Sequence, residues 1–224
     1  MSARELVIVA LAGAAPALPP GWPIVVRRVV AASAFGSPHE LAAAADLEHA
    51  NVLWLPPWAA LTPVVVASVG AWLALPEPEG GNPRVAHAAL RLCCGSTSIS
   101  FGRRHLVLSS PGAVDLVGDA PRPRAASRGS ELDDVWEAGL PDDLASHLEA
   151  VNVQSSTAAR LRHAAGELTT WRALTVTPLA LLARSMAGVH GSRREALPRV
   201  VIEAYRDVLV AAKLWELAHG PAVA

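Results

Sequence analysis

Residues 49–76 read HANVLWLPPWAALTPVVVASVGAWLALP, a stretch that contains no Asp, Glu, Lys or Arg. Its first apolar run, Val52–Leu55, predicts a short buried strand, and Pro56-Pro57-Trp58 predicts a rigid turn after it. Thr62-Pro63 is typical of a helix N-cap followed by the first helical residue, so we expect a helix over residues 64–75. A buried strand that leads through a turn into a helix favours an α/β fold.

Two apolar stretches also allow a membrane interpretation. Residues 49–76 are long enough to cross a bilayer, but Pro56, Pro57 and Pro63 would break the helix. Residues 6–13, LVIVALAG, resemble the core of a signal peptide, although a buried first strand ending at Gly13 explains them equally well. We therefore expect neither a spanning helix nor secretion, and we expect the chain in the cytoplasm.

The rest of the first half predicts further strands and short helices. β-Branched runs over residues 5–11 and 24–30 predict two strands, and Pro38–Ala45 predicts an Ala-rich helix capped by Ser37. Residues 84–108 predict two or three strands with turns at Gly95 and Gly102. Frequent Pro and Gly residues predict an exposed loop over residues 111–130.

From Glu131 onward the pattern favours helices. Pro141-Asp142-Asp143 is a strong helix start, and Thr177-Pro178 begins another helix. The clearest element is the last helix, residues 198–219. Its apolar stripe, which we expect to pack on the body of the protein, consists of Val201, Tyr205, Val208, Ala212 and Trp215. The sequence thus predicts an α/β domain over residues 1–130 and a helical extension over residues 131–224.

Composition excludes several classes of function. The chain has 224 residues, 52% of them hydrophobic, and 19 basic against 20 acidic side chains give a net charge of −1. This balance disfavours nucleic-acid binding through bulk charge. The two cysteines, Cys93 and Cys94, are adjacent and provide neither a disulfide framework nor a CxxC metal motif.

Catalytic motifs are scarce. The sequence has no GxSxG, GxxxxGK[ST], GxGxxG or HExxH motif. An acidic cluster over residues 131–137 could hold a metal or act as a base, or could form the solvated start of a helix. Residues 84–128 contain seven Arg against two Asp, which suits a phosphate-bearing ligand or an anionic lipid surface, or is ordinary surface charge.

The C-terminal half carries a family resemblance. Leu132–Asn152, the pair Ser155-Ser156, Gly166, Pro178 with Arg184, and the terminal motif AKLWE at residues 212–216 follow one another in this order. This arrangement resembles bacterial family 2 glycosyltransferases of the lipopolysaccharide-core glucosyltransferase type. The resemblance implies a shortened GT-A-like, Rossmann-like α/β domain with a C-terminal helical extension. It also implies a nucleotide-sugar ligand and C-terminal helices that contact the inner membrane surface.

The first half departs from that family at the site. Where the family carries the acidic Asp-x-Asp motif that binds a divalent cation, this chain has Pro56-Pro57-Trp58, so we expect no metal and no cofactor. Asp119 is the acid nearest to the family's general base, and Glu131 is the next candidate. The arginines that could take the place of the cation at a diphosphate are Arg103, Arg104, Arg122 and Arg124.

Three functions fit these observations. The first is a family 2-like protein that has lost sugar transfer and serves as a binding or scaffold subunit for a nucleotide sugar or another protein. The second is an active, metal-independent glycosyltransferase of cell-surface polysaccharide synthesis. The third is an unrelated structural or membrane-associated protein. The loss of the acidic motif favours the first, a cytoplasmic pseudoenzyme at the periphery of the inner membrane.

Overall fold

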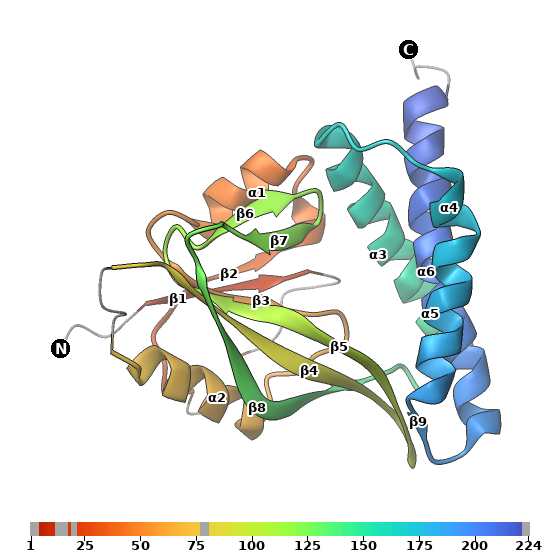
Figure 1. Cartoon of the computed structure of the whole chain (residues 1–224), viewed down its shortest axis with the longest axis horizontal. Coiled ribbons are helices and arrows are strands. Elements are labelled where there is room, and N and C mark those ends of the chain that lie inside the picture. The colour runs from red at the N-terminus through yellow and green to blue at the C-terminus, as the bar shows by residue number, and fades with distance from the viewer. Residues whose placement is uncertain (1–4, 12–17, 19–21, 77–80, 221–224) are drawn as a thin grey trace.

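The computed structural model describes residues 5–11, 18, 22–76 and 81–220, and within them the side chains of residues 101–103, 171, 172 and 178 are not described. A mixed sheet forms the centre, with strands in the order β2-β1-β3-β5-β4-β8 and helices packed around it (Figure 1). The two-residue strand β9 (Val189–His190) pairs with β5. This mixed α/β architecture is compatible with a Rossmann-like fold and agrees with the α/β class expected from the sequence.

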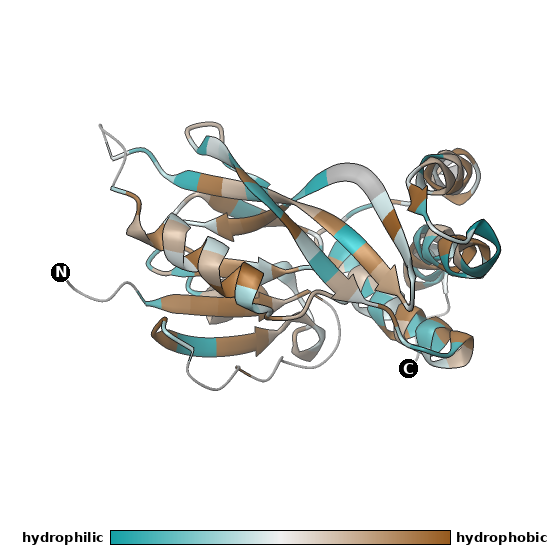
Figure 2. Cartoon of the chain, turned by 90° about the horizontal axis from the view of Figure 1, so that it is seen from below, coloured by the Kyte–Doolittle hydropathy of each residue, from teal (hydrophilic) through white to brown (hydrophobic). Residues whose placement is uncertain are grey.

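One half of the sheet is parallel. β1 (Leu6–Ala10) lies between β2 (Val26–Ala31) and β3 (Asn51–Leu55), and both pairings are parallel. β1 is hydrophobic along its whole length (Figure 2). Its side chains alternate between two clusters, because successive residues of a strand point to opposite faces of the sheet. Each face must therefore be covered by other elements.

Helices and a hairpin cover these two faces. α1 (Pro38–Ala45) and the hairpin of β6 (Val114–Val117) and β7 (Ala120–Pro123) pack on one face, and α2 (Pro63–Ala74) packs on the other. The 3-10 turn Ala32–Ala34 precedes α1. The N-caps predicted for α1 and α2 are confirmed, since the hydroxyls of Ser37 and Thr62 each accept a bond from a backbone N–H of the first turn.

The other half of the sheet is mixed. β4 (Arg84–Cys94) and β5 (Thr97–Ser109) form an antiparallel hairpin, and β5 joins β3 antiparallel. β8 (Arg128–Gly139) lies parallel to β4 at the edge of the sheet. The turn expected at Gly95 is confirmed, whereas the turn expected at Gly102 is wrong, because β5 continues through that residue.

Two further expectations are corrected here. Residues 111–130 are not an open loop, because they contain the β6–β7 hairpin and the start of β8. The helices do not begin at Glu131, because β8 continues to Gly139, and the expected division between residues 130 and 131 falls inside this strand. An edge strand tolerates acidic side chains that face water, and these acids made the segment resemble a helix start.

The helical part consists of α3 (Leu144–Ala164), α4 (Trp171–Leu174), α5 (Val176–Ala187) and α6 (Arg193–His219). These helices stand together at one end of the sheet (Figure 1). Asp143 caps α3, as the sequence predicts. Within the described part of the chain, no helix combines the length and the apolar character needed to cross a bilayer.

The predicted packing of α6 is wrong. Tyr205 and Trp215, which belong to the expected buried stripe, are 48% and 54% exposed. The buried face of α6 instead includes Arg199, Val200 and Glu203. The helix therefore turns polar side chains toward the sheet, and these help to build the candidate site.

Candidate functional site

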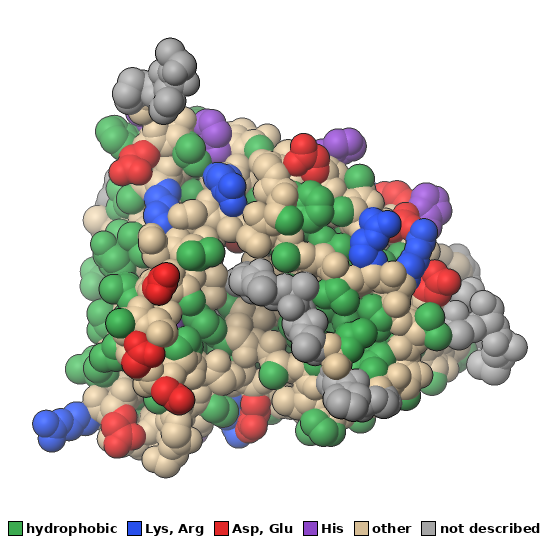
Figure 3. Space-filling model, turned by 180° about the vertical axis from the view of Figure 1, so that it is seen from behind, with side chains coloured by type: hydrophobic (Ala, Val, Ile, Leu, Met, Phe, Trp, Pro, Cys, Tyr) green, Lys and Arg blue, Asp and Glu red, His purple; other side chains and the backbone are tan. Residues whose placement is uncertain are grey.

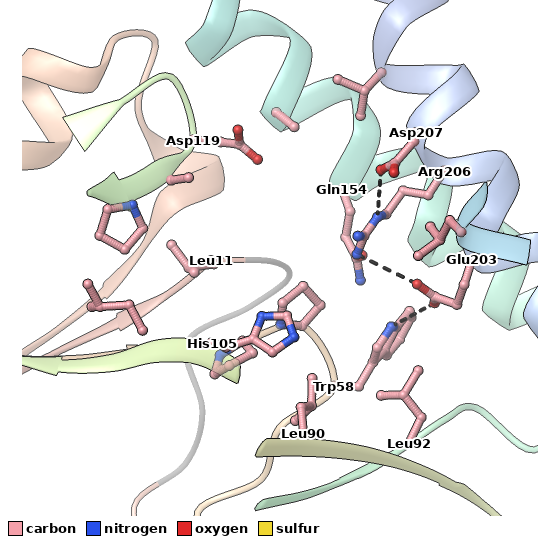
Figure 4. A pocket seen from close by; sticks show the side chains of 18 of the residues that line it. Leu11, Trp58, Leu90, Leu92, His105, Asp119, Gln154, Glu203, Arg206 and Asp207 are labelled. Atoms are coloured by element: carbon pink, nitrogen blue, oxygen red, sulfur yellow. Dashed lines mark hydrogen bonds and ion pairs between the residues drawn. The ribbon is translucent and has the colours of Figure 1, made fainter. Parts of the chain in front are cut away.

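A cavity of about 350 Å³ lies between the sheet and the C-terminal helices. Its walls include Leu11, which follows β1, and Pro56-Pro57-Trp58, which follows β3, together with residues of the β6–β7 turn, α3 and α6. Figure 4 shows these side chains converging on the cavity from the sheet and from the helices. Open α/β sheets bind ligands outside the carboxyl ends of their parallel strands, which is where this cavity lies.

Trp58 connects the turn after β3 to the helical part. Its φ of 68° lies in the left-handed region, which is uncommon and costly for a residue other than glycine. The indole Nε1–H donates to Glu203 Oε1 at 3.1 Å, and the ring meets the His147 ring edge-on at a centroid distance of 5.3 Å. These contacts with α6 and α3 hold Trp58 in its unusual backbone conformation.

Glu203 is the most enclosed acid of the site. Its side chain is 4% exposed and that of His147 is 0% exposed, and His147 Nε2 lies 2.9 Å from Glu203 Oε1. Burial alone would raise the pKa of Glu203, but the His147 hydrogen bond, the charge of Arg206 and the Trp58 N–H outweigh burial and lower the pKa. Glu203 is therefore an ionised carboxylate that is already bonded, and it is a weak proton acceptor.

Two buried polar atoms beside this cluster have no hydrogen-bond partner within the described part of the chain. They are His147 Nδ1 and the amide oxygen of Gln154, which lines the cavity. An unpaired buried polar group costs roughly 1–3 kcal/mol. A ligand that enters the cavity with an N–H or O–H group would give Gln154 its missing donor.

Asp119, the first candidate for a general base, lines the cavity from the tip of the β6–β7 hairpin. Its carboxylate accepts a bond from Arg162 Nε at 2.7 Å. Burial would lower the pKa of Arg162, but the charge of Asp119 raises it above its ordinary value. The preceding Gly118 has a φ of 62°, and a Cβ there would lie 2.7 Å from Arg162 Cγ, so the hairpin tip needs glycine to approach α3.

The other predicted site residues are spread over the molecule. Arg104 lines the cavity, where it donates to the Leu132 carbonyl at 2.9 Å and lies 3.4 Å from Glu131, an exposed residue of β8. Arg124 lies outside the cavity in ion pairs with Glu48 and Asp115. Arg122 is exposed on β7, and the side chain of Arg103 lies outside the described residues. Among the described arginines predicted for ligand binding, the structure brings only Arg104 to the cavity.

The chemistry of the walls fits binding. One part is apolar, formed by Pro56, Pro57, Leu90 and Leu92. The other part carries Gln154 with three arginines and three acids, namely Arg104, Arg162, Arg206, Asp119, Glu203 and Asp207. No group of three or more His, Cys, Asp or Glu side chains in the described part of the chain could hold a metal ion. The arrangement can accept a ligand with an apolar or ring-shaped portion and a polar portion that bonds to Gln154 and to the charged side chains.

The sequence does not reveal the centre of this site. It predicts Trp58 only as part of a turn, and it does not predict Glu203, His147, Gln154 or Arg162 as site residues. The only sequence signal is that charged residues occupy the face of α6 opposite its apolar stripe, which ordinarily indicates a solvated face.

Comparison of the chain with models of protein families, with curated proteins and with solved structures found no match to any of them. The function must therefore be argued from the site itself, because a fold alone does not determine a function.

Proposed function

We propose that this chain is a diverged relative of family 2 glycosyltransferases that binds a nucleotide-sugar-like ligand in the cavity without transferring the sugar. It would then act as a cytoplasmic binding or scaffold subunit in polysaccharide synthesis. We also propose that the central sheet follows the GT-A arrangement. Its parallel half β2-β1-β3, continued by the mixed half β5-β4-β8, is compatible with that arrangement.

The observation that carries the proposal is the state of the carboxylates around the cavity. Asp119 is paired with Arg162 at 2.7 Å, and Glu203 is bonded by His147 and Trp58. Asp207, the third acid of the walls, lies 3.8 Å from Arg206 Nε. These contacts engage one oxygen of Asp119 and one of Glu203, and no group of three or more His, Cys, Asp or Glu side chains in the described part of the chain could hold a metal ion. The acids therefore support the walls of a binding site better than they support metal-dependent transfer.

One observation favours an active, metal-independent transferase as the second candidate. Asp119 and Arg104 line the same cavity, so a base and a cation could act on one ligand. Transfer would require a carboxylate oxygen of Asp119 to reach the acceptor hydroxyl while Arg162 holds Oδ1. Asp119→Asn should then reduce turnover by about 10²–10⁴-fold. Under the binding proposal, no turnover of common nucleotide sugars is measured, and Asp119→Asn changes nothing in that assay.

A binding experiment tests the proposal directly. Nucleoside diphosphates and nucleotide sugars are titrated into the full chain by calorimetry, with manganese and with EDTA. We expect binding that is equal under both conditions. Unfolding of the chain at a ligand concentration of 100 times Kd should then require about 2.7 kcal/mol more. Binding that needs manganese, or no binding of any nucleotide, contradicts the proposal.

A matched pair of arginine variants tests whether the ligand binds in the cavity. Arg104→Gln removes one charge from the cavity wall and should weaken binding roughly 10- to 150-fold, because a charge-assisted hydrogen bond contributes roughly 1.5–3 kcal/mol. Arg124→Gln removes an arginine that lies outside the cavity and should leave Kd unchanged. Equal loss in both variants would indicate nonspecific attraction by surface charge instead of binding in the cavity.

A further inference from the structure

The outer face of α6 is apolar along most of its length. Its partly or largely exposed residues are spaced by four, four, three, four and three positions, namely Leu197, Val201, Tyr205, Val208, Ala212 and Trp215. We call these six residues the α6 stripe. Seen from behind, hydrophobic side chains gather along the edge of the molecule that the C-terminal helices form (Figure 3).

The spacing of the α6 stripe is that of a helix-pairing seam. Steps that alternate between three and four residues keep apolar side chains on one side of a helix, where they can interdigitate with a second helix. The opposite side of α6 is already packed, with Ala196, Val200 and Ala204 in the core and Glu203 at the cavity. The α6 stripe is thus free to pair with a helix outside this chain.

Charges at the two ends of the stripe are complementary. Arg194 and Glu216 are both exposed, and each lies eleven residues from Tyr205, one before it and one after it. At a rise of 1.5 Å per residue, each charge lies about 16 Å from Tyr205 along the helix axis. If two copies of α6 pack antiparallel and cross at Tyr205, Arg194 of each copy meets Glu216 of the other.

The same arrangement brings the apolar side chains of the two copies together. Leu197 comes opposite position 213 of the second copy, two residues from its Trp215. Val201 comes opposite position 209, between Val208 and Ala212 of the second copy. One arginine and one glutamate give the face no net charge, which suits pairing with itself better than it suits an anionic lipid surface.

We propose that the protein forms a symmetric dimer through antiparallel pairing of the α6 stripe, with Tyr205 near the two-fold axis. Tyr205 and Trp215 are each about half exposed, and large aromatic side chains bury roughly 150–250 Å² when fully covered. With the aliphatic residues of both copies, the buried area reaches the order of 1,000 Å², the lower range for a specific interface. The proposal is independent of what the cavity binds.

The test is the mass of the full-length protein in solution, measured by sedimentation equilibrium over a range of concentrations. We expect a monomer–dimer equilibrium for the natural chain. Tyr205→Glu places two like charges beside the axis and should raise the dimer Kd by 100-fold or more. The matched control is Leu179→Glu, because Leu179 is 67% exposed on α5 and lies outside the α6 stripe. This control should leave the dimer Kd unchanged.

Charge reversal tests the antiparallel register. Arg194→Glu and Glu216→Arg should each raise the dimer Kd about tenfold, and the double variant should return to within about threefold of the natural chain. Thermal unfolding followed by circular dichroism verifies that each variant is folded. A purely monomeric natural chain overturns the proposal, as does equal dimerisation of Tyr205→Glu and the natural chain. The proposal is also overturned if the natural chain forms no dimer but sediments together with anionic vesicles, and Tyr205→Glu abolishes this co-sedimentation. That result would assign the α6 stripe to a membrane surface.

Discussion

The parallel half of the sheet and helix α6 differ in how well hydropathy predicts which side chains they bury. In β3, Leu53 and Trp54 are completely buried, as their hydropathy predicts. In α6, Arg199 and Glu203 are buried, whereas Tyr205 and Trp215 are about half exposed. The comparison teaches that apolar burial specifies the sheet, whereas α6 is oriented both by an apolar buried face and by the polar bonds of Arg199 and Glu203.

The largest effect should come from the core of the sheet. Trp54 is 0% exposed, and its Nε1–H donates to Ser109 Oγ at 2.9 Å. Trp54→Ala should lower the free energy of unfolding by about 3–5 kcal/mol, because it removes a large buried ring and leaves a cavity. Chemical denaturation measures this change. A loss below about 1 kcal/mol would contradict the claim that apolar burial specifies the parallel half.

The next effect concerns the polar attachment of α6. The guanidinium of Arg199 donates to the carbonyls of Pro141 and Asp142, directly before α3. Arg199→Met keeps the length of the side chain but leaves both carbonyls without this donor, so unfolding should require about 2–3 kcal/mol less. Arg193→Met, at an exposed position in the first turn of the same helix, is the control and should change little. Equal losses of stability in the two variants would show that the buried Arg199 contributes no more to the attachment of α6 than the exposed Arg193.

A pH titration sharpens the role of Glu203. The pKa of this carboxyl is lower in the folded chain than its ordinary value, so its ionisation stabilises the fold above the unfolded pKa. That contribution is lost as the pH falls through the lowered, folded pKa. Glu203→Gln should therefore flatten the fall of stability with acidification in the range below about pH 4.5. Parallel curves for the natural chain and the variant, from denaturation at several pH values, would contradict this assignment.

The smallest effect should come from the α6 stripe. Trp215 is 54% exposed, so Trp215→Ala should change the free energy of unfolding of the monomer by no more than about 0.5 kcal/mol. Stability should be measured at protein concentrations well below the dimer Kd, where dimerisation does not contribute to the free energy of unfolding. A loss of 3 kcal/mol in the monomer would show that Trp215 packs on the body of the protein after all.

Much of the fold could be predicted from local sequence. The boundaries of α1 are those that Ser37 and Pro38 predict, and β3 and α2 follow their apolar and capping patterns closely. These elements are specified by residues within or beside them. β8 could not be predicted, because its strand conformation depends on pairing with β4, which lies about forty residues earlier in the chain.

Only part of the candidate site could be predicted from the sequence. Asp119 and Arg104 do line the cavity, as the predicted candidates for base and anion binding. The cluster of Trp58, His147 and Glu203 could not be found, because it joins three elements from distant parts of the chain. The neighbouring sequence also does not distinguish a buried Glu in a helix from an exposed one, because Glu ordinarily indicates a solvated face.

The hydrogen bond between Trp58 and Glu203 cannot form until late in the synthesis of the chain, because its two partners are made far apart in time. The two residues are 145 positions apart in the chain. Translation at about 5–20 residues per second therefore delivers Glu203 roughly 7–30 s after Trp58. The strands from β4 to β8 are synthesised during that interval, and the wall of the cavity that α6 provides is synthesised after them. The cavity is thus complete only after α6 has been made, so its formation depends on the C-terminal helices as well as on a correctly folded sheet.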